Sequence, residues 1–509
     1  MADICVASHH SSIRELLRDS EFLSLAGRDG YLIELRLDFY SDLSIESLDL
    51  ALKRFAPRTV VTCRHPDEGG KNPALSNEER LSYLQHAADK GVMYVDIEAR
   101  TPRKGFKKKK SKLIVSYHDF NGGADSSPEF LPGMKKLAHA FEGCDLSKQA
   151  CLLKTELDMR AQIMTAWSAS SAYQENGLEC LDLGMGEAGL WTRILAPLFG
   201  APFTFARGEG AAGTAPGQPT WRELDELYRV REMKPGWPFY GVIGNPVGHS
   251  LSPLLHNTAF RELKLDGVYV PLKIEGDPVA IVKTFGQIGL RGVSITIPHK
   301  EANWAEIAEV DEFAKSIGAI NTLSYRDEKW FATNTDAVAA ADSLEDVAGS
   351  LKGKRVAILG AGGAAKAVAY GIKERGGEIF IANRTRERAV SLAAAVGATV
   401  ITLDELGSKG VEIIVNTTSV GMYPNVHQSP LEKDQIPHGS IVFDTVYNPL
   451  RTKLLTLADE RGCRTLGGAE MFIGQGVRQF ELWTGRKAPR ALVTAAILAA
   501  LSVRQAQQR

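Results

Sequence analysis

Short, almost continuously apolar runs alternate with longer polar segments throughout the first half of the chain. Buried parallel strands have such runs, and the polar segments are long enough to form helices between them. Eight runs qualify as strands, at residues 4–7, 31–39, 59–64, 93–99, 112–120, 150–156, 178–185 and 202–208. Eight strand–helix units over about 230 residues predict a (β/α)8 barrel. An open doubly wound sheet is the alternative that this pattern leaves.

Polar and charged residues gather where these runs end. They are Glu34, Arg36, Arg64, His118 and Lys154 in the runs or at their ends, and Arg193, Thr214 and Gln218 after the last two runs. The strand ends of a barrel converge on its carboxyl-terminal mouth, where barrel enzymes hold their active sites. The pattern therefore predicts a polar site at this mouth.

A polar helical segment at residues 221–233 and the turn KPGWP at 234–238 separate the two halves of the chain. We place the first module at residues 1–233, with the boundary in this turn. The connection is too short to be a long flexible tether, so we expect the two modules to be held close together.

The second half alternates strands and helices in two parts. A strand at 240–243 opens a mixed α/β part that runs to about residue 337. The stretch KRVAILGAGGAA at 354–365 has a strand, a glycine-rich turn and the start of a helix, and further strands are expected at 378–382, 413–416 and 441–444. The tail is helical from about residue 471. We therefore predict a Rossmann-type domain at 338–469, and a second α/β domain formed by 239–337 and 470–509.

The composition narrows the class of protein. At 509 residues the chain is too long for one core, and its apolar content of 44% and charged content of 24% are ordinary for a globular protein. The formal net charge of −1 gives no field that favours nucleic acid or a membrane. The six cysteines form no CxxC pair, so we expect no disulfide framework and no metal site. The amino terminus has no signal-peptide pattern, and we expect a cytoplasmic protein, or a plastid protein if a transit peptide has been removed.

Lys154 and His118 close two neighbouring predicted strands and are the first candidates for chemistry. A lysine that is partly desolvated has a lowered pKa and so keeps the free amine that attacks a carbonyl. A histidine titrates near neutral pH and can move a proton. A lysine that reaches out to water and a hydrogen-bonded core histidine are the alternatives. Together the two residues favour a Schiff-base site.

Five motifs in the first half resemble type I 3-dehydroquinate dehydratase. They are ELRLD at 34–38, CRHPDEGG at 63–70, SYHDF at 116–120, GMGEAGLWTR at 184–193 and TAPGQP at 214–219. The order and spacing of the family are kept over about residues 1–230, and five motifs in order are far more specific than any one of them. The resemblance implies a barrel that removes water from 3-dehydroquinate and yields 3-dehydroshikimate.

The resemblance also implies a role for each polar residue of the mouth. Lys154 would form an imine with the C3 ketone of the substrate, and this imine would acidify the C2 proton. His118 would take that proton and later assist loss of the hydroxyl, while Glu68 would orient His118. The substrate would be held at its carboxylate by Arg193, Thr214 and Gln218, and at its ring hydroxyls by Glu34, Arg36 and Arg64.

Two positions depart from the family pattern. The family's lysine is usually followed by Ile-Ala or a similar pair, whereas Lys154 is followed by Thr155 and Glu156. An acid so close would raise the pKa of the lysine. Thr214 stands where serine is common, and it keeps the hydroxyl that a carboxylate needs.

The glycine-rich turn of the second half predicts a dinucleotide site. Glycines permit a tight turn and the close approach of a pyrophosphate to the start of a helix. The residues of this turn are Gly360, Ala361, Gly362, Gly363 and Ala364. The next strand is followed by Asn383, Arg384, Thr385 and Arg388, with no acid before the arginines to bind the ribose of NAD. Arginines suit a 2′-phosphate, so we predict NADP(H) as the cofactor. An ordinary strand–helix loop is the alternative.

Motifs throughout the second half resemble shikimate dehydrogenase. They are VIGNPVGHSLSPLLHN, VSITIPHK, GAINTL, NTDA, NTTSVGM and GGAEMFIGQGVRQFELWTG, over about residues 239–505. The resemblance implies a two-domain α/β dehydrogenase in which Lys300 and Asp336 form the catalytic pair. It implies that Ser250 and Ser252 bind the substrate carboxylate, that Thr296, Asn321, Tyr447 and Gln475 line the ring, and that Thr445 and Gly468 lie near the nicotinamide. Ala337 departs from the family, which usually has glycine after NTD.

The two resemblances together predict one bifunctional enzyme of aromatic biosynthesis. The first module would make 3-dehydroshikimate, and the second would reduce it to shikimate with NADPH. Quinate as the preferred substrate of the second module and a non-catalytic regulatory relative are the alternatives. The expected partners are small-molecule substrates, with no nucleic acid and no membrane, and the sequence makes no prediction of oligomeric state.

Overall fold

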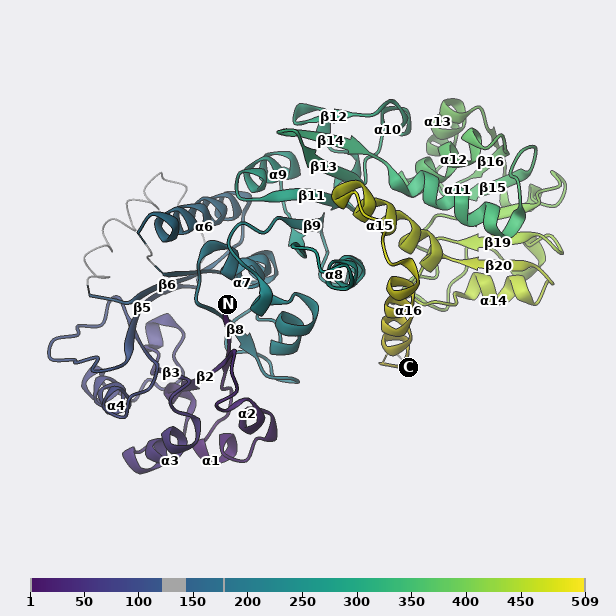
Figure 1. The fold of residues 1–509 in the computed structure, drawn as a ribbon. Coiled ribbons are helices and arrows are strands. Elements are labelled where there is room, and N and C mark those ends of the chain that lie inside the picture. The colour runs from purple at the N-terminus through teal and green to yellow at the C-terminus, as the bar shows by residue number, and fades with distance from the viewer. Residues whose placement is uncertain (1, 121–142, 177–178, 508–509) are drawn as a thin grey trace. The chain divides into compact units, whose positions relative to one another are not determined.

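The computed structural model describes residues 2–120, 143–176 and 179–507 (Figure 1). Two compact units make up the chain. The first contains Met1–Tyr240, Asn245–Gly248 and Asp266–Leu290, and the second contains Gly241–Gly244, His249–Leu265 and Arg291–Arg509. The first unit therefore includes two segments from beyond residue 233. The bounds of the two compact units thus differ from those of the predicted domains.

Eight parallel strands form the sheet of the first unit. They are β1 (Asp3–Ala7), β2 (Tyr31–Arg36), β3 (Thr59–Thr62), β4 (Tyr94–Glu98), β5 (Lys112–Asp119), β6 (Leu146–Leu152), β7 (Cys180–Met185) and β8 (Phe203–Arg207). Their order is β7-β6-β5-β4-β3-β2-β1-β8, and β1 is hydrogen-bonded to both β2 and β8. From β1 to β7 each strand pairs with its sequence neighbour, and β8 pairs with β1, so the described strands form a barrel that is nearly closed, with β7 and β8 at its two edges. This is the topology of a (β/α)8 barrel, which confirms that prediction over the open sheet.

Helices follow most of these strands. They are α1 (Ile13–Leu16), α2 (Ser20–Leu25), α3 (Ile45–Phe55), α4 (Asn77–Asp89), α6 (Glu156–Asn176) and α7 (Leu190–Leu195). Helix α3 illustrates their construction, because Ser44 opens it with a capping box that satisfies the first free N–H groups. Its buried residues Leu48, Ala51, Leu52 and Phe55 recur at three- or four-residue spacing and so share the face that meets the barrel.

The inside of the barrel changes from apolar to charged along the strands. Alternate residues of a strand share one face, so the inward residues come from every second position. Toward the amino ends they belong to one apolar cluster that includes Cys5, Leu32, Val60, Tyr94, Ile114 and Leu146. Two positions further along, the buried residues of β2 to β6 are polar, namely Glu34, Thr62, Asp96, Ser116 and Lys148. A charged layer therefore lies on an apolar floor.

The first unit also contains β10 (Val268–Lys273) and α9 (Pro278–Gln287). Strand β10 packs against α7, and α9 packs against α6. Helix α9 begins sharply, because the Asp277 side chain accepts from the Val279 N–H and Pro278 occupies the first helical position. Residues from the second half of the sequence thus belong to the packing of the barrel.

The second unit begins with a mixed sheet. It contains the last four residues of β9 (Phe239–Gly244), together with β11 (Leu290–Ile295), β12 (Ala308–Val310), β13 (Thr322–Arg326) and β14 (Lys329–Thr333). Strand β13 pairs antiparallel with β11 and β14, and β12 pairs parallel with β14. The helices are α8 (Ser252–Glu262), α10 (Glu312–Ile317), α11 (Thr335–Ala348), α15 (Gly468–Thr484) and α16 (Arg490–Gln507). Both tail helices, α15 and α16, contact α8, and α15 also contacts α11.

Six parallel strands form the other sheet of the second unit. They are β15 (Arg355–Leu359), β16 (Glu378–Ala382), β17 (Thr399–Val400), β18 (Ile413–Asn416), β19 (Ile441–Asp444) and β20 (Arg464–Gly467), with helices α12 (Gly363–Glu374), α13 (Arg386–Val396) and α14 (Lys453–Asp459). The order β17-β16-β15-β18-β19-β20 turns back between β15 and β18. Such a switch point is where doubly wound folds bind nucleotides, and the predicted Rossmann-type fold is confirmed.

Two negative findings apply to the part of the chain that the structure describes. No helix there combines the length and the apolar character that a membrane span needs. The same residues contain no group of three or more His, Cys, Asp or Glu side chains arranged to hold a metal ion.

Candidate active sites

A pocket lies at the carboxyl ends of the barrel strands, and we call it the barrel pocket. It is lined by Glu34, Arg36, Arg64, Glu68, Gly69, His118, Phe120, Lys148, Ala150, Leu183, Met185, Arg193, Phe205, Thr214, Ala215 and Gln218. Every residue predicted for the dehydratase is in this group except Lys154. The strand ends have thus gathered residues that are far apart in the sequence into one polar cavity.

The lysine of the barrel pocket is Lys148, whereas we expected Lys154. Strand β6 covers Leu146–Leu152, so it starts four residues before the predicted strand at 150–156. Lys148 therefore lies within the strand and faces inward, while Lys154 lies beyond its end and lines a different cavity. The strand was misplaced because an inward-facing charge interrupts the apolar run by which buried strands are recognised.

The residues that follow each lysine in the sequence favour Lys148 over Lys154. Lys148 is followed by Gln149 and Ala150, which is closer to the Ile-Ala pattern of the family than Thr155 and Glu156 are. The departure that the sequence presented at Lys154 therefore disappears when the strand is placed correctly.

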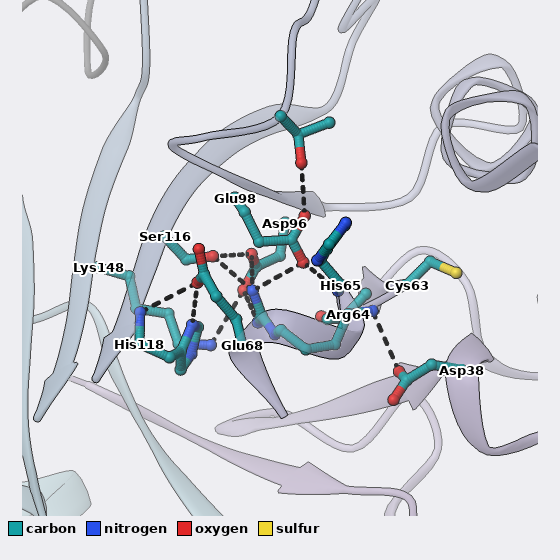
Figure 2. A network of polar contacts seen from close by, with 12 residues as sticks. Asp38, Cys63, Arg64, His65, Glu68, Asp96, Glu98, Ser116, His118 and Lys148 are labelled. Carbon is teal, nitrogen blue, oxygen red and sulfur yellow. Dashed lines mark hydrogen bonds and ion pairs between the residues drawn. The ribbon is translucent and has the colours of Figure 1, made fainter. Parts of the chain in front are cut away.

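Asp96 is at the centre of the charged layer (Figure 2). Its Oδ2 accepts from Lys148 Nζ and from Arg64 Nη2, both at 2.9 Å, and its Oδ1 accepts from Ser116 Oγ at 2.5 Å. Asp96 is 0% exposed and Lys148 is 4% exposed. Burial alone would raise the pKa of Asp96, but Arg64 and Lys148 hold it far below its ordinary value. Asp96 is therefore an anion that fixes both cations. Sequence reasoning did not single it out.

The Arg64 side chain is held in the pocket by contacts to other protein side chains. Its Nη1 donates to Ser116 Oγ at 2.6 Å and lies 3.2 Å from Glu98 Oε1. Glu98 Oε2 in turn accepts from Arg80 Nη2 at 2.5 Å. Burial alone would lower the pKa of Arg64, but Asp96 and Glu98 raise it. The guanidinium is thus held by protein acids, although we expected it to contact the substrate ring.

Arg36 and Glu34 also have protein partners. Arg36 Nε and Nη2 donate to the two carboxylate oxygens of Asp38 at 3.0 and 2.8 Å. Glu34 Oε1 accepts from Thr62 Oγ1 at 2.7 Å. Such bidentate and buried contacts fix the side chains in place. Both residues still line the pocket, so they present fixed charges to a ligand.

His118 and Glu68 form a second buried pair. Glu68 Oε2 lies 3.0 Å from His118 Nδ1 and also accepts from the His118 backbone N–H at 3.0 Å. Burial, and after it the positive charges of Arg64 and Lys148, lower the pKa of His118 well below its ordinary value. Burial raises the pKa of Glu68 to about 7. The imidazole is therefore neutral near pH 7, and with Nδ1 protonated toward Glu68, Nε2 keeps the lone pair that a base requires.

Arg193 is a buried cation with no ion pair to any of the residues that the structure describes. It is 2% exposed, and among the described residues its Nε has no hydrogen-bond partner. Burial lowers its pKa to about 10. Two other residues that line the pocket are bonded to each other. Gln218 Oε1 accepts from the Thr214 backbone N–H at 2.9 Å and from Thr214 Oγ1 at 3.2 Å. An uncompensated guanidinium in a polar pocket suits an anionic group of a ligand.

The second unit has its own lysine–acid pair. Lys300 Nζ lies 2.6 Å from Asp336 Oδ2, and the two side chains are 19% and 10% exposed. Asp336 stands in the first turn of α11, where Asn334 caps the helix. The Lys300 carbonyl accepts from the Ile320 N–H at 2.8 Å. The backbone bond at Lys300 and the capped start of α11 thus bring together two residues that are 36 positions apart.

Predicted substrate residues lie on the elements around this pair. Asn321 Oδ1 accepts from the Thr335 N–H at 2.8 Å, directly before Asp336 in the chain. The Thr296 N–H donates to the Ile243 carbonyl at 3.0 Å, which joins the loop after β11 to β9. Ser250 Oγ accepts from the Ser252 N–H at 3.2 Å at the start of α8.

Tyr447 and Gln475 form another group on and beside α15. The Tyr447 ring stacks on Phe472 with centroids 4.9 Å apart, and Gln475 Nε2 donates to the Phe472 carbonyl at 2.9 Å. Thr445 approaches the start of the same helix, because a side chain at Gly468 would overlap the Thr445 carbonyl. Only glycine fits there, which explains its place in the motif.

The glycine-rich turn joins β15 to α12 and fits a dinucleotide. Gly360 has φ +118°, and a Cβ there would lie 2.6 Å from Thr417 Oγ1, so glycine is required. Ala361 and Gly362 follow, and α12 starts at Gly363 with Ala364 next. A Cβ on Gly363 would lie 3.9 Å from Lys300 Cδ, so this turn is beside the Lys300–Asp336 pair. The helix start and the open backbone suit a pyrophosphate.

The end of β16 fits a 2′-phosphate. The strand ends at Ala382, and Asn383 Nδ2 donates to the Thr385 carbonyl at 2.8 Å, which shapes the turn into α13. Three arginines in and after this turn are exposed, namely Arg384, Arg386 and Arg388. Arg386 was not among the predicted residues, although it stands in the same run. Three exposed guanidinium groups can bind the 2′-phosphate of a cofactor, which an acid at this position would repel.

Sequence models of four families match consecutive parts of the chain. They are type I 3-dehydroquinase at residues 4–235, the shikimate dehydrogenase substrate binding domain at 242–323, shikimate / quinate 5-dehydrogenase at 342–439, and the shikimate 5'-dehydrogenase C-terminal domain at 468–498. These matches follow the order of the barrel, the mixed sheet, the Rossmann-type sheet and the tail helices.

Relatives of known activity match in the same way. The NADP(+) shikimate dehydrogenase of Moorella thermoacetica is 41% identical over 52% of this chain and 93% of its own length. A crystal structure of a shikimate dehydrogenase in complex with NADP+ is 36% identical, with a TM-score of 0.50, and covers 52% of this chain and 96% of that chain. The chloroplastic bifunctional 3-dehydroquinate dehydratase/shikimate dehydrogenase of Arabidopsis thaliana is 38% identical over 96% of this chain and 83% of its own length. The chain therefore belongs to the family of bifunctional 3-dehydroquinate dehydratase/shikimate dehydrogenases.

Proposed function

We propose that this shikimate-pathway enzyme works through two separate sites, each centred on a lysine. The barrel pocket dehydrates 3-dehydroquinate to 3-dehydroshikimate, and the second unit reduces 3-dehydroshikimate to shikimate with NADPH. One observation carries the first assignment, namely that Lys148 lies in the same pocket as His118 and the uncompensated Arg193. The Lys300–Asp336 pair beside the glycine-rich turn carries the second.

Lys148 is the nucleophile of the dehydratase. His118 takes a proton from the Lys148 ammonium, and the free amine then attacks the C3 ketone. The protonated His118 returns this proton to the hydroxyl of the adduct, which leaves as water, so that a protonated imine remains and His118 is neutral again. The protonated imine draws electrons from C2 and acidifies the proton there, so no metal is needed. Asp96 accepts from Nζ at 2.9 Å and so fixes the position from which the amine attacks. This role replaces the one that the sequence suggested for Lys154.

His118 moves the proton. Its neutral Nε2 takes the C2 proton and returns it to the departing hydroxyl, which leaves as water. Hydrolysis of the imine then consumes one water and releases 3-dehydroshikimate and free Lys148, so the net loss is one water. Glu68 holds the Nδ1 side of the ring at 3.0 Å and favours the tautomer that this exchange requires.

The substrate carboxylate binds Arg193, with Thr214 and Gln218 beside it. This assignment rests on the buried guanidinium that the described residues leave without a partner at Nε. Glu34 and Arg36 face the ring hydroxyls from fixed positions. Arg64 acts mainly on its neighbours, because its own Nη atoms are bonded to Asp96, Glu98 and Ser116.

In the second unit, Lys300 gives the proton that the ketone oxygen needs as shikimate forms. Asp336 at 2.6 Å orients the ammonium group and stabilises its charge. NADPH, when bound, supplies the hydride. The remaining proposed contacts to the substrate are Ser250, Ser252, Thr296, Asn321, Tyr447 and Gln475, and those to the cofactor are residues Gly360, Ala361, Gly362, Gly363, Ala364, Asn383, Arg384, Thr385, Arg388, Thr445 and Gly468.

Small molecules are the proposed partners, and the proposed domains are 1–233, 239–337 with 470–509, and 338–469. We propose a cytoplasmic or plastid location for the chain. The Arabidopsis relative is described as chloroplastic, which supports the plastid.

Borohydride trapping tests the role of Lys148. Borohydride added during turnover of 3-dehydroquinate should reduce the imine to a stable amine on the Lys148 peptide, which mass spectrometry identifies. K148M should form no adduct, and its dehydratase rate should fall by about 10³-fold or more because the nucleophile is gone. K154M is the matched control and should keep both the adduct and the rate. An adduct on Lys154, or an undiminished adduct in K148M, would contradict the assignment.

The pH profile of the dehydratase tests Glu68. With a pKa raised to about 7, Glu68 loses the charge that orients His118 as the pH falls below this value. We therefore expect kcat/KM to rise with pH through about 7. In E68Q this rise of kcat/KM with pH, the acidic limb of the profile, should vanish, and kcat/KM should drop by roughly 10- to 100-fold. D67N, whose side chain is 79% exposed, should keep the limb. An unchanged limb in E68Q would exclude Glu68 as the titrating group.

Cofactor kinetics test the arginines after β16. R384A/R388A should lower kcat/KM for NADPH by about 10²-fold or more, because each of the two charge-assisted contacts to the 2′-phosphate is worth about 1.5–3 kcal/mol. NADH lacks this phosphate and serves as the internal control, so its kcat/KM should change by less than about twofold. Equal losses with both cofactors would show that the arginines do not read the phosphate.

A further inference from the structure

Helix α7 carries the carboxylate-binding residue of the barrel pocket and is only six residues long. Arg193 lines the pocket, and Trp191 stands two positions earlier in the same helix. Two positions correspond to about 200° around a helix, so the two side chains leave it in nearly opposite directions. Whatever holds Trp191 therefore acts on the back of the helix that presents Arg193.

Trp191 is held by an aromatic residue from the second half of the chain. Its ring meets the edge of Phe285 of α9 at 5.0 Å between centroids and 82° between planes. Phe199 of the barrel lies 6.4 Å away on another side, and Phe285 itself meets Phe239 at 6.0 Å. Trp191, Phe239 and Phe285 are each 0% exposed. Buried tryptophans contribute large contact areas, so this row of rings supports the back of α7, together with β10, which also packs against this helix.

Polar contacts tie the same segments to the turns of the pocket. Glu187, in the turn before α7, accepts from the Gly248 N–H at 3.1 Å and lies 3.4 Å from Lys273 Nζ. Glu156, at the start of the helix after β6, accepts from the Asp277 N–H at 3.0 Å. Strands β6 and β7 precede these two turns, and β6 carries Lys148. Segments 245–248 and 266–290 thus support the turns that follow both strands.

The position of Arg193 depends on this packing because little else fixes its side chain. Among the described residues its Nε has no hydrogen-bond partner. The helix is attached to the barrel through Thr192, whose Oγ1 accepts from the Gly184 N–H and donates to the Gly189 carbonyl, both at 2.7 Å. The Arg193 carbonyl accepts from Thr204 Oγ1 at 2.8 Å. These bonds anchor the backbone of α7 to the barrel, whereas Trp191 packs against Phe285 of α9.

We propose that Phe285 is a positioning residue for the dehydratase, which it serves by holding α7 through Trp191 and so placing Arg193 for the substrate carboxylate. Phe285 lies within residues 242–323, which match the shikimate dehydrogenase substrate binding domain. The segment 266–290 therefore has a second task that its family does not imply. The proposal rests on the function proposed above, in which Arg193 binds the carboxylate of 3-dehydroquinate.

Steady-state kinetics of the full chain test the proposal. F285A should raise the dehydratase KM for 3-dehydroquinate by about tenfold, while kcat changes by less than about threefold, because binding is disturbed and the Lys148 chemistry is not. F285L keeps most of the apolar volume and should show an intermediate KM. K283A, on the exposed side of α9, is the matched control and should behave as wild type. Shikimate dehydrogenase activity of each variant reports whether the chain is folded.

A double-mutant cycle shows whether the effect passes through Arg193. In an R193K background, F285A should raise KM by less than about twofold, because the interaction that Phe285 supports is already impaired. The same increase in both backgrounds, or an unchanged KM in a folded F285A, would overturn the proposal. If F285A does not fold, F285L decides by the same criteria. A wild-type chain without dehydratase activity would instead refute the proposed function itself.

Discussion

The buried carboxylate of Asp96 is the contact on which the barrel pocket depends. It binds two cations, Lys148 and Arg64, inside a barrel whose floor is apolar. Removing charges from water costs several kcal/mol per ion, and only close partners offset this cost. Without Asp96, two like charges would face each other in a medium of low dielectric constant. Because Asp96 is present, Lys148 is held in one position in mid-strand, which suits the role of nucleophile that we propose for it.

The same charges determine the state of the other groups in the pocket. Burial and the nearby Arg64 and Lys148 keep His118 neutral, so it can accept a proton, and Glu68 holds its ring. Arg193 remains as a buried positive charge whose pKa is lowered by burial and whose Nε lacks a partner among the described residues. In the proposed function, the carboxylate of the substrate supplies the missing negative charge. The pocket would then select for a carboxylate through its electrostatics as well as through its shape.

The sequence predicts the architecture well, and it predicts eight of the residues that line the barrel pocket, although not its lysine. Continuously apolar runs and the order of the motifs are local features, and they led to the barrel, the Rossmann-type sheet and these lining residues. Lys148 was missed because its inward-facing charge breaks the apolar run that marks a buried strand. Asp96 was missed because its role comes from contacts with Arg64 and Lys148, which only the folded sheet brings together. The packing of Phe285 on Trp191 is likewise a long-range contact with no local signal.

In the proposed function, one chain contains two complete sites. The ketone that forms at Lys148 is the ketone that is reduced beside Lys300. Complementation between two variants tests this picture most directly. Supplied with 3-dehydroquinate and NADPH, K148M alone should form no shikimate, and K300M alone should accumulate 3-dehydroshikimate. An equimolar mixture should form shikimate again, because each chain supplies the site that the other lacks. Shikimate formation by K148M alone, or by K300M alone, would contradict the assignment of one essential lysine to each site.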